Sequence, residues 1–315
     1  MAYTPYYAEL SAEGVDPVRF HGSGTLDALG LTGDGITGWY SMPAVKVDAT
    51  ARGQGDGGHD IAEDTIMYAS RTVTLHWNAN SADRAGVLAL TDLIRRFAHR
   101  LVRLRVVDAD SDTYCEGGYL AMKQASVYRH AMVEPSSVTI VFERPERLAT
   151  NAQLFQLLPL DGQGQGLFYG DRLETYWTGA PNDSVSVLSV TPGSDGLVYP
   201  VNYGRPGGDG RNRGVLENHG TSRAYPQLSV VGDFPQGVRL LLGDGAIIEY
   251  TQPVTVGAPL NLDFRSRTAR IDGRDMSRWL SHRGFSPIKA RSSMSIVLKS
   301  EGEGYVTCLT HDTYM

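Results

Sequence analysis

The sequence contains very little cysteine. Its 315 residues include only Cys115 and Cys308, which lie far apart in the chain. Two cysteines are too few for the disulfide framework of a small secreted protein or for a zinc cluster. Free cysteine is among the residue types most often buried in folded proteins, so we predict that both thiols lie in apolar surroundings.

Long hydrophobic runs are also missing. No segment approaches the roughly 18 apolar residues that a membrane-spanning helix needs. The first residues, MAYTPYYAELSAEG, have neither the basic flank nor the apolar stretch of a secretory signal. These absences predict a chain that is made in a cytoplasm and has no membrane partner.

The sequence has no excess of positive charge. The formal net charge is -6 at pH 7, whereas nucleic-acid-binding proteins usually present a basic surface to the phosphates. Five arginines do occur between Arg95 and Arg105, on an expected helix end and the strand that follows. We interpret them as a solvated face or as partners of ion pairs between subunits.

The acidic segment DADSDTYCEGG resembles a calcium-binding loop, since Asp108, Asp110 and Asp112 alternate as the ligands of such a loop do. The next positions do not fit. Thr113 occupies the place of an obligatory glycine, and Tyr119 occupies that of the bidentate carboxylate. Because aspartate and serine also favour turns, we predict an acidic hairpin turn without a metal.

Motifs for phosphate binding and for catalysis are absent from the sequence too. The glycine-rich residues 52–60 have no lysine and no following helix, so they predict a flexible loop rather than a phosphate-binding loop. No Gly-x-Ser-x-Gly elbow is present to pair a serine with His219, His282 or His311. The carboxylates Glu301 and Glu303 lie in KSEGEGY, which is typical of a hairpin tip. The sequence predicts a protein that is not an enzyme and holds no metal or cofactor.

Glycine and proline, by contrast, are plentiful. The 36 glycines and 15 prolines are spread along the chain, which is typical of many short strands joined by tight turns. Apolar residues alternate strictly in 71–77, 101–108 and 136–142, so they share one face of each expected strand. The predicted inward residues are Val73, Leu75, Trp77, Val102, Leu104, Val106, Val138, Ile140 and Phe142. These patterns predict a mainly β protein.

One segment, 80–100, predicts an α-helix. Ser81 can cap the free amides at its start, and Asp83 suits the positive end of the helix dipole. The basic residues Arg95, Arg96, His99 and Arg100 suit the negative end. Apolar residues recur at helical spacing; they are Val87, Leu90, Leu93, Ile94, Phe97 and Leu101.

The patterns divide the chain into two domains. Residues 1–150 show strands, the helix and further strands. Residues 151–183 are glycine-rich and polar, for example PLDGQGQGLFYGD, and predict a connector. Strands return from 184 to 315 at separations of roughly eight to twelve residues, which predicts a β-sandwich.

The C-terminal segments resemble the distal tail protein family of long, flexible-tailed bacteriophages. The resemblance is carried by GLVYPVNYG, ENHGTSRAYPQLSVVGDF, GAPLNLDFRSRTARIDGRD and GFSPIKARSSMSIVLKSEGEGYVTC. They show an aromatic-Pro strand, an Asn-x-Gly turn, a second aromatic-Pro pair and an Asp before an Arg-Thr turn. The matching residues are Asn218, Gly220, Tyr225, Pro226, Asp263, Arg267 and Gly273.

This resemblance implies a minor tail protein of the virion, at the tail tip, that is assembled in the host cytoplasm. Residues 1–150 would be a belt domain of β-sheets with one helix, and 184–315 a galectin-like β-sandwich. Six copies would form a ring that joins the tail tube to the baseplate and carries host-adhesion proteins. The implied partners are further copies, the tail tube, tape measure and tail hub or tip proteins, and receptor-binding proteins. DNA would pass through the ring without specific binding.

The resemblance also implies roles for single residues. Gly220 would supply a turn, Asn218 would bond to its own backbone, and Pro226 would begin a strand where a missing donor is tolerated. An edge strand is safe once a neighbouring copy pairs with it. We predict that 71–77 and 101–108 are such edges, which makes Arg71, Thr72, Arg103 and Arg105 candidate subunit contacts. Trp177 is a further candidate interface anchor.

Two other functions remain open. A carbohydrate-binding module is compatible with two β domains and four tryptophans, although a shared fold does not carry a sugar site with it. A cell-wall-degrading glycosidase would need two carboxylates that face each other across a cleft. Glycan binding tests the first alternative, and release of reducing sugar from wall polymer tests the second.

Overall fold

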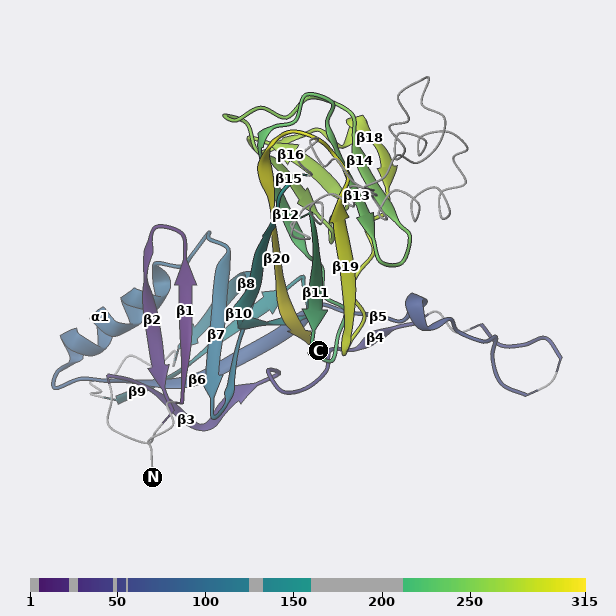
Figure 1. The fold of residues 1–315 in the computed structure, drawn as a ribbon. Helices are drawn as coiled ribbons and strands as arrows, with labels where there is room; N and C mark the ends of the chain where they lie inside the picture. Colours follow the sequence, from purple (N-terminus) through teal and green to yellow (C-terminus); the bar gives the residue numbers. More distant parts are fainter. Residues whose placement is uncertain (1–5, 23–27, 48–49, 55, 125–132, 160–211) are drawn as a thin grey trace, which may run out of the picture. The chain divides into compact units, whose positions relative to one another are not determined.

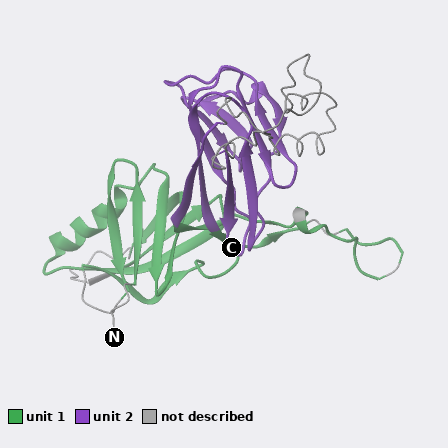
Figure 2. Cartoon of the chain, in the orientation of Figure 1, with its two compact units in different colours: residues 1–150, 313–315 green, residues 151–312 purple. Residues whose placement is uncertain are grey.

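The computed structural model describes residues 6–22, 28–47, 50–54, 56–124, 133–159 and 212–315 (Figure 1). The chain divides into two compact units (Figure 2): residues 1–150 with 313–315 form unit 1, and residues 151–312 form unit 2. Most described residues lie in β-strands, and the one α-helix among them is α1 (Arg84–Arg95). The predicted mainly β fold with a single helix is confirmed.

Unit 1 is built on a sheet that closes on itself. Its strands lie in the order β8-β7-β1-β2-β3-β6-β9, and β9 pairs back onto β8. Neighbours are antiparallel except β2 and β3, which meet in parallel at one residue pair. The strands are β1 (Tyr7–Ala12), β2 (Val15–His21), β3 (Leu29–Thr37), β6 (Arg71–Asn80), β7 (Val102–Asp108), β8 (Ser111–Gln124) and β9 (Val133–Phe142).

The interior of this barrel follows the alternation of the sequence. In β6, Val73, Leu75 and Trp77 are fully buried, and Trp77 meets Phe20 edge to face with ring centroids 5.6 Å apart. The predicted inward residues of β7 and β9 are also buried. Each large apolar side chain that leaves water contributes about 1.5–3 kcal/mol to folding. The inward faces predicted for these strands are confirmed.

Helix α1 packs beside the barrel but differs at both ends from the prediction. It begins at Arg84, and its N-cap is Asp83, whose carboxylate accepts a hydrogen bond from the Gly86 amide at 2.7 Å. The Ser81 cap was therefore wrong. The chain leaves the helix after Arg95, and His99 takes a left-handed φ of 60°. As a result Leu101 falls outside the helix and is 69% exposed.

The prediction that 71–77 and 101–108 are sheet edges is wrong. Strand β6 pairs with β3 on one side and β9 on the other. Strand β7 likewise lies between β1 and β8. Alternation reports which face of a strand is buried, whereas the number of its neighbours depends on how the sheet closes.

An extended segment leaves the barrel between β3 and β6, and we call residues 41–69 the arm. Strands β4 (Val45–Lys46) and β5 (Met67–Tyr68) pair near its base, and the short 3-10 helix η1 (Glu63–Thr65) lies beyond them. Near the tip, the glycine-rich stretch predicted as a flexible loop folds back on itself through a bridge between Ala51 and Gly58. The arm projects from the barrel of unit 1 in Figure 1.

Unit 2 is a β-sandwich. One sheet has the order β17-β16-β15-β12-β20 and the other has the order β11-β19-β13-β14-β18, and both contribute to one hydrophobic core. The strands are β11 (Arg213–Asn218), β12 (Gln227–Asp233), β13 (Val238–Leu242), β14 (Ile247–Tyr250), β15 (Leu260–Asp263), β16 (Thr268–Ile271), β17 (Arg274–Asp275), β18 (Leu280–Arg283), β19 (Ser292–Leu298) and β20 (Glu303–Tyr314). The expected sandwich is confirmed.

Two strands carry the chain between the units. Strand β10 (Arg147–Leu157) begins in unit 1 and continues into unit 2, and β20 returns the chain to unit 1 at Thr313. Residues 151–157, which were assigned to the connector, therefore belong to a strand. The rest of the connector from 160, and the residues from 184 to 211 at the start of the predicted sandwich, lie outside the described residues.

Candidate functional site

The Asn-x-Gly turn is a buried hydrogen-bonding junction at the end of β11. The Asn218 side-chain oxygen accepts from the Gly220 amide at 3.1 Å. Its Nδ2 donates to the carbonyls of Ser222, Ile288 and Lys289 at 2.7, 3.3 and 3.1 Å. One side chain thus joins the turn to the segment that leads into β19. Because a buried polar group is costly without partners, this geometry suits a structural role.

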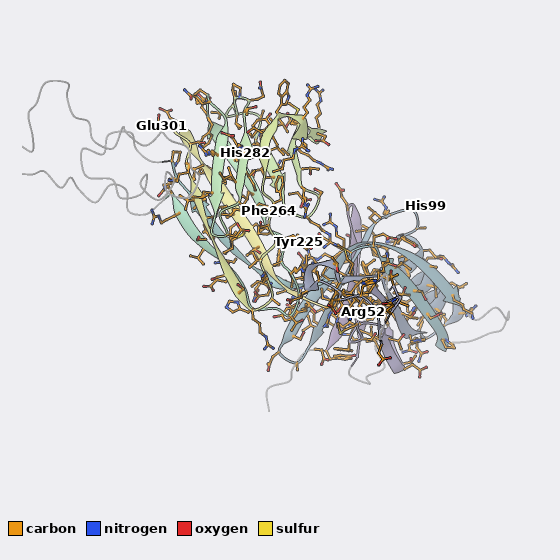
Figure 3. The ribbon with its side chains drawn as sticks, turned by 90° about the vertical axis from the view of Figure 1, so that its right-hand side faces the viewer. Arg52, His99, Tyr225, Phe264, His282 and Glu301 are labelled. Carbon is orange, nitrogen blue, oxygen red and sulfur yellow. The ribbon has the colours of Figure 1, made fainter. Side chains whose placement is uncertain are left out.

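The aromatic-Pro pair lies immediately before β12, which starts at Gln227. The Pro226 carbonyl accepts from the Phe264 amide at 3.2 Å, and its missing N–H falls at the position just before the strand. The Tyr225 ring is partly buried against the core and has the Arg265 guanidinium 5.2 Å from its centroid. Tyr225 and Phe264 lie in the body of unit 2 (Figure 3).

The Asp before the Arg-Thr turn closes the β15–β16 hairpin. The Asp263 carboxylate accepts from the Arg265 amide at 2.9 Å and from the Ser266 hydroxyl at 2.8 Å. Arg267 completes the turn with a left-handed φ of 55°. In the next hairpin Gly273 has a φ of 76°, a conformation that suits glycine because it has no side chain. These motif residues all shape turns.

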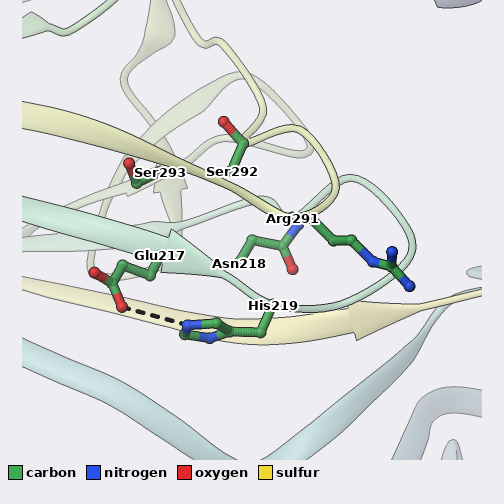
Figure 4. Close-up of a pocket in the computed structure, with 6 residues that line it drawn as sticks. All are labelled: Glu217, Asn218, His219, Arg291, Ser292 and Ser293. Atoms are coloured by element: carbon green, nitrogen blue, oxygen red, sulfur yellow. Dashed lines mark ion pairs between the residues drawn. The ribbon is translucent and has the colours of Figure 1, made fainter.

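A shallow hollow adjoins the Asn218 turn (Figure 4). It is lined by Glu217, Asn218, His219, Arg291, Ser292 and Ser293. The exposed His219 imidazole lies 3.5 Å from the Glu217 carboxylate and 3.3 Å from that of Asp312. Asp312 also accepts from the His219 backbone amide at 2.7 Å. This arrangement holds two strands together at the surface and aligns no nucleophile.

A second polar cluster lies on β14 and β18. The Ser281 hydroxyl and the His282 ring nitrogen Nδ1 both bind the same oxygen of Glu249, at 2.5 and 2.8 Å. The hydrogen bond from Ser281, assisted by the one to His282, holds the pKa of Glu249 below its usual value. In a nucleophilic triad the histidine stands between the serine and the acid. Here the serine binds the acid directly, so the relay is not assembled.

Among the described residues, no three His, Cys, Asp or Glu side chains gather in a way that could hold a metal ion. Helix α1 is too short and polar to cross a membrane, and the described residues contain no other α-helix. Cys115 and Cys308 are buried as predicted, and burial raises the pKa of each thiol to about 12.

The carboxylate pair Glu301 and Glu303 does not form a hairpin tip. Glu301 lies in the link between β19 and β20, which belong to opposite sheets of the sandwich, and Glu303 begins β20. The expected hairpin is therefore wrong, because the turn residues join two sheets rather than paired strands. The predicted acidic turn is confirmed: β7 and β8 form a hairpin through Ala109 and Asp110, and Ala109 has a φ of 49°.

Two of the candidate contact residues lie on the outside of the barrel. Arg105 forms a two-pronged ion pair with Asp112, at 2.8 and 2.6 Å, and Thr150 donates to the same carboxylate at 2.6 Å. The hydrogen bonds from Arg105 are the main cause of the lowered pKa of Asp112. The Arg103 guanidinium lies 3.6 Å from the centroid of the Tyr114 ring. Both arginines are thus held in place within their own chain.

Arg71 contradicts its assignment as a surface contact. Its side chain is buried, with 1% exposure, and donates from Nε to the Pro145 carbonyl at 2.6 Å. Its Nη1 faces the carbonyls of Gly38, Trp39 and Ser41 at 2.9, 2.9 and 2.7 Å. Arg71 shares the inward face of β6 with Val73, a signal that the sequence already contained. Thr72 is exposed, and Trp177 lies outside the described residues.

Gln153 is a structural residue that the sequence did not reveal. Its side-chain amide donates to the Val215 carbonyl at 2.9 Å and accepts from the Glu217 amide at 2.8 Å. The Gln153 side chain thereby binds backbone amide and carbonyl groups of β11, which is the end strand of its sheet. Unpaired strand edges invite association with other chains, so this bond pattern protects the edge.

No family model matches the sequence, and no curated protein sequence matches it. Among solved structures, the crystal structure of the Dit protein (gp 19.1) of phage SPP1 matches with a TM-score of 0.56 at 10% identity. The match covers 98% of this chain and 99% of that chain. The chain has the fold of a phage Dit protein.

The SPP1 Dit protein is described as a paradigm of the hub adsorption apparatus in phages that infect Gram-positive bacteria. Two structures of the phage P2 baseplate in its activated conformation, one with calcium and one with strontium, also match. Their TM-scores are 0.46 and 0.48 at 8% and 9% identity, with 98% and 97% of both chains covered. Both TM-scores indicate a weaker likeness than the one to SPP1 Dit. The Dit fold of this chain is therefore inferred from the SPP1 protein.

Proposed function

We propose that this protein is a structural component of a bacteriophage tail tip, of the distal tail type. The observation that carries the proposal is the likeness to SPP1 Dit over 98% of the chain, which includes both units. Asn218, Asp263 and Gly273 support it, because these residues of the resembling motif form turns rather than a catalytic arrangement. Fold alone does not establish function, so the assembly must be tested.

In the proposed assembly, six copies form a ring with a central channel. Residues 1–150 are the ring-forming belt, the residues from the end of β10 to 183 are the connector, and 184–315 are the outward sandwich that carries adhesion proteins. The ring joins the tail tube to the baseplate and contacts the tape measure and hub proteins. Thr72, Arg103 and Arg105 remain candidate contact residues. The protein acts in the virion, is assembled in the host cytoplasm, and lets DNA pass without specific binding.

Trp279 gives the sugar-binding alternative little support. Among the described tryptophans, Trp39 and Trp77 are buried, with 1% exposure or less. Trp279 is exposed by 36%, and the Arg278 guanidinium lies 4.9 Å from the centroid of its ring, which leaves at most one face for a sugar to stack on. We therefore retain the structural proposal alone.

Electron microscopy of the purified full-length protein tests the proposal. In negative stain, we expect rings with six subunits and a central channel. The protein should also bind the ends of isolated tail tubes. Particles that stay monomeric and leave the tube ends bare would rule the proposal out, and release of reducing sugar from wall polymer would contradict the structural assignment.

A further inference from the structure

The arm exposes apolar side chains that no described segment of its own chain covers. Met42, Val45 and Met67 are each more than half exposed, and Ile61 and Ile66 are exposed by 47% and 36%. A two-stranded ribbon is marginally stable in water without a surface to pack on. Several exposed apolar side chains on one short segment often mark an interaction site. The arm therefore requires a partner surface.

The charge of the arm indicates the chemistry of that surface. Residues 41–69 contain two basic and five acidic residues, a net charge of -3. Asp60 is almost fully exposed even though it pairs with Arg52 at 3.0 Å. A partner should therefore combine apolar side chains with positive charge.

The end of α1 has this combination. Residues 93–101 contain three arginines and one histidine and no acidic residue. The side chain of Arg95 binds those of Asp92 and Gln124. Arg100 donates to a backbone carbonyl, which carries no net charge, so the positive charge of Arg100 is not compensated. Leu101, the last residue of this segment, is 69% exposed, and Leu88, in the first half of α1, is 41% exposed.

The two surfaces lie on opposite sides of unit 1. In Figures 1 and 2 the arm extends away from the barrel on the side opposite α1. The arm therefore cannot reach the helix of its own chain. Two different surfaces on opposite sides of one body form head-to-tail contacts, which close into a ring when the rotation between copies allows it.

We propose that the arm of one copy docks onto the basic end of α1 in a second copy. Ile61, Ile66 and Met67 cover the exposed leucines, and Asp60 and Glu63 face Arg96 and Arg100. The inference deepens the proposed ring and rests on it, because it names the two surfaces that meet between neighbouring subunits.

Charge reversal in the full-length protein tests the contact. The arm variant combines Asp60→Lys with Glu63→Lys, the helix variant combines Arg96→Glu with Arg100→Glu, and a third protein carries all four changes. Light scattering and native mass spectrometry measure the association constant. We expect each pair of changes to lower it by about tenfold or more, and the four changes together to restore much of the loss. The matched control, Glu301→Lys with Arg274→Glu in unit 2, should associate like the wild type.

The outcomes separate this inference from the proposed function. If the arm variant forms the same rings as the wild type, the docking is refuted, whereas the proposed ring itself still stands. Loss of association in the arm variant alone, with no effect in the helix variant, would show that the arm binds elsewhere and would also refute it. A wild-type protein that stays monomeric overturns the docking, and binding to tube ends then decides the proposed function. Circular dichroism melts confirm that every variant is folded.

Discussion

At the scale of single residues, two buried polar side chains organise the turns of the protein. Arg71 joins the carbonyls at the base of the arm to that of Pro145. Asn218 joins the turn after β11 to the segment before β19. The carbonyls of these irregular segments have no partner strand among the described residues. Each of the two side chains supplies the hydrogen-bond donors that a neighbouring strand would otherwise provide. Their substitution should therefore affect folding more than any surface contact does.

Replacing Arg71 by lysine should destabilise unit 1 by about 2–4 kcal/mol, since an ammonium group cannot reproduce the planar set of donors. Burial already lowers the pKa of Arg71, and fewer hydrogen bonds would leave the buried charge less well compensated. Urea unfolding measures the change. Arg96→Lys, on the exposed helix end, is the control and should shift stability by less than about 0.5 kcal/mol. An unchanged unfolding midpoint in Arg71→Lys would contradict the role assigned to this side chain.

Asn218 offers a test in which two substitutions separate the donor from the acceptor. Asn218→Ala removes the donor and the acceptor of this side chain and should cost about 2–4 kcal/mol. Asn218→Asp keeps the acceptor for Gly220 but turns a negative oxygen toward three carbonyls, so it should be at least as destabilising. Thermal unfolding provides the measurement, and Ser293→Ala, at an exposed position of the neighbouring strand β19, is the control. An aspartate variant as stable as the wild type would show that the donors are unimportant.

At the scale of elements, the two units and the arm differ in how their strand edges and apolar faces are covered. Unit 1 closes its main sheet into a barrel, which removes the exposed edges. Strand β11 in unit 2 is an end strand, and the Gln153 amide bridges Val215 and Glu217 along it. The arm is the contrasting case, because its ribbon keeps its apolar side chains in water until a partner covers them.

Gln153→Ala should free the backbone of β11 on its outer side. We expect the Glu217 amide to exchange its hydrogen roughly tenfold faster, since it loses its acceptor, and the variant to aggregate more readily. Hydrogen–deuterium exchange gives the readout, with the Val230 amide in the interior strand β12 as an internal reference. Equal protection of the Glu217 amide in both proteins would rule out the capping role of Gln153.

At the scale of the whole molecule, the chain leaves unit 1 along β10 and returns to it along β20. Residues 313–315 thus complete a unit whose other residues are the first 150. Thr313 is buried, and the Met315 carbonyl accepts from Arg147 at 3.4 Å. Contacts between such distant residues form late and slow folding.

A chain that ends at Asp312 should therefore keep the sandwich but lose stability in unit 1 by about 1–2 kcal/mol, through one lost hydrogen bond and lost packing. Limited proteolysis resolves the two units, and the barrel strands should be cut faster in the shortened chain while β12 to β16 resist as before. The conservative control, Tyr314→Phe, keeps the chain length and should behave like the wild type. Equal cutting rates would show that the C-terminus adds nothing to unit 1.

The sequence was sufficient for the features that depend on neighbouring residues. Alternation predicted the buried faces of β6, β7 and β9, because side chains of a strand point to opposite sides with a period of two. The turns around Asn218 and Asp108 were also predictable, since their residue types favour local hydrogen bonds. The helix was located, but its cap moved from Ser81 to Asp83, because capping depends on which oxygen reaches a free amide.

Features that depend on distant residues required the folded chain. Barrel closure could not be predicted, because alternation does not say which strands pair, and the two expected edges became interior strands. Arg71 had the parity of a buried residue, but the carbonyls that make its burial possible come from 38–41 and from Pro145. The exposure of the arm likewise follows from the absence of any described segment that packs over it. Local periodicity determines the direction of a side chain, and only tertiary contacts determine what it meets.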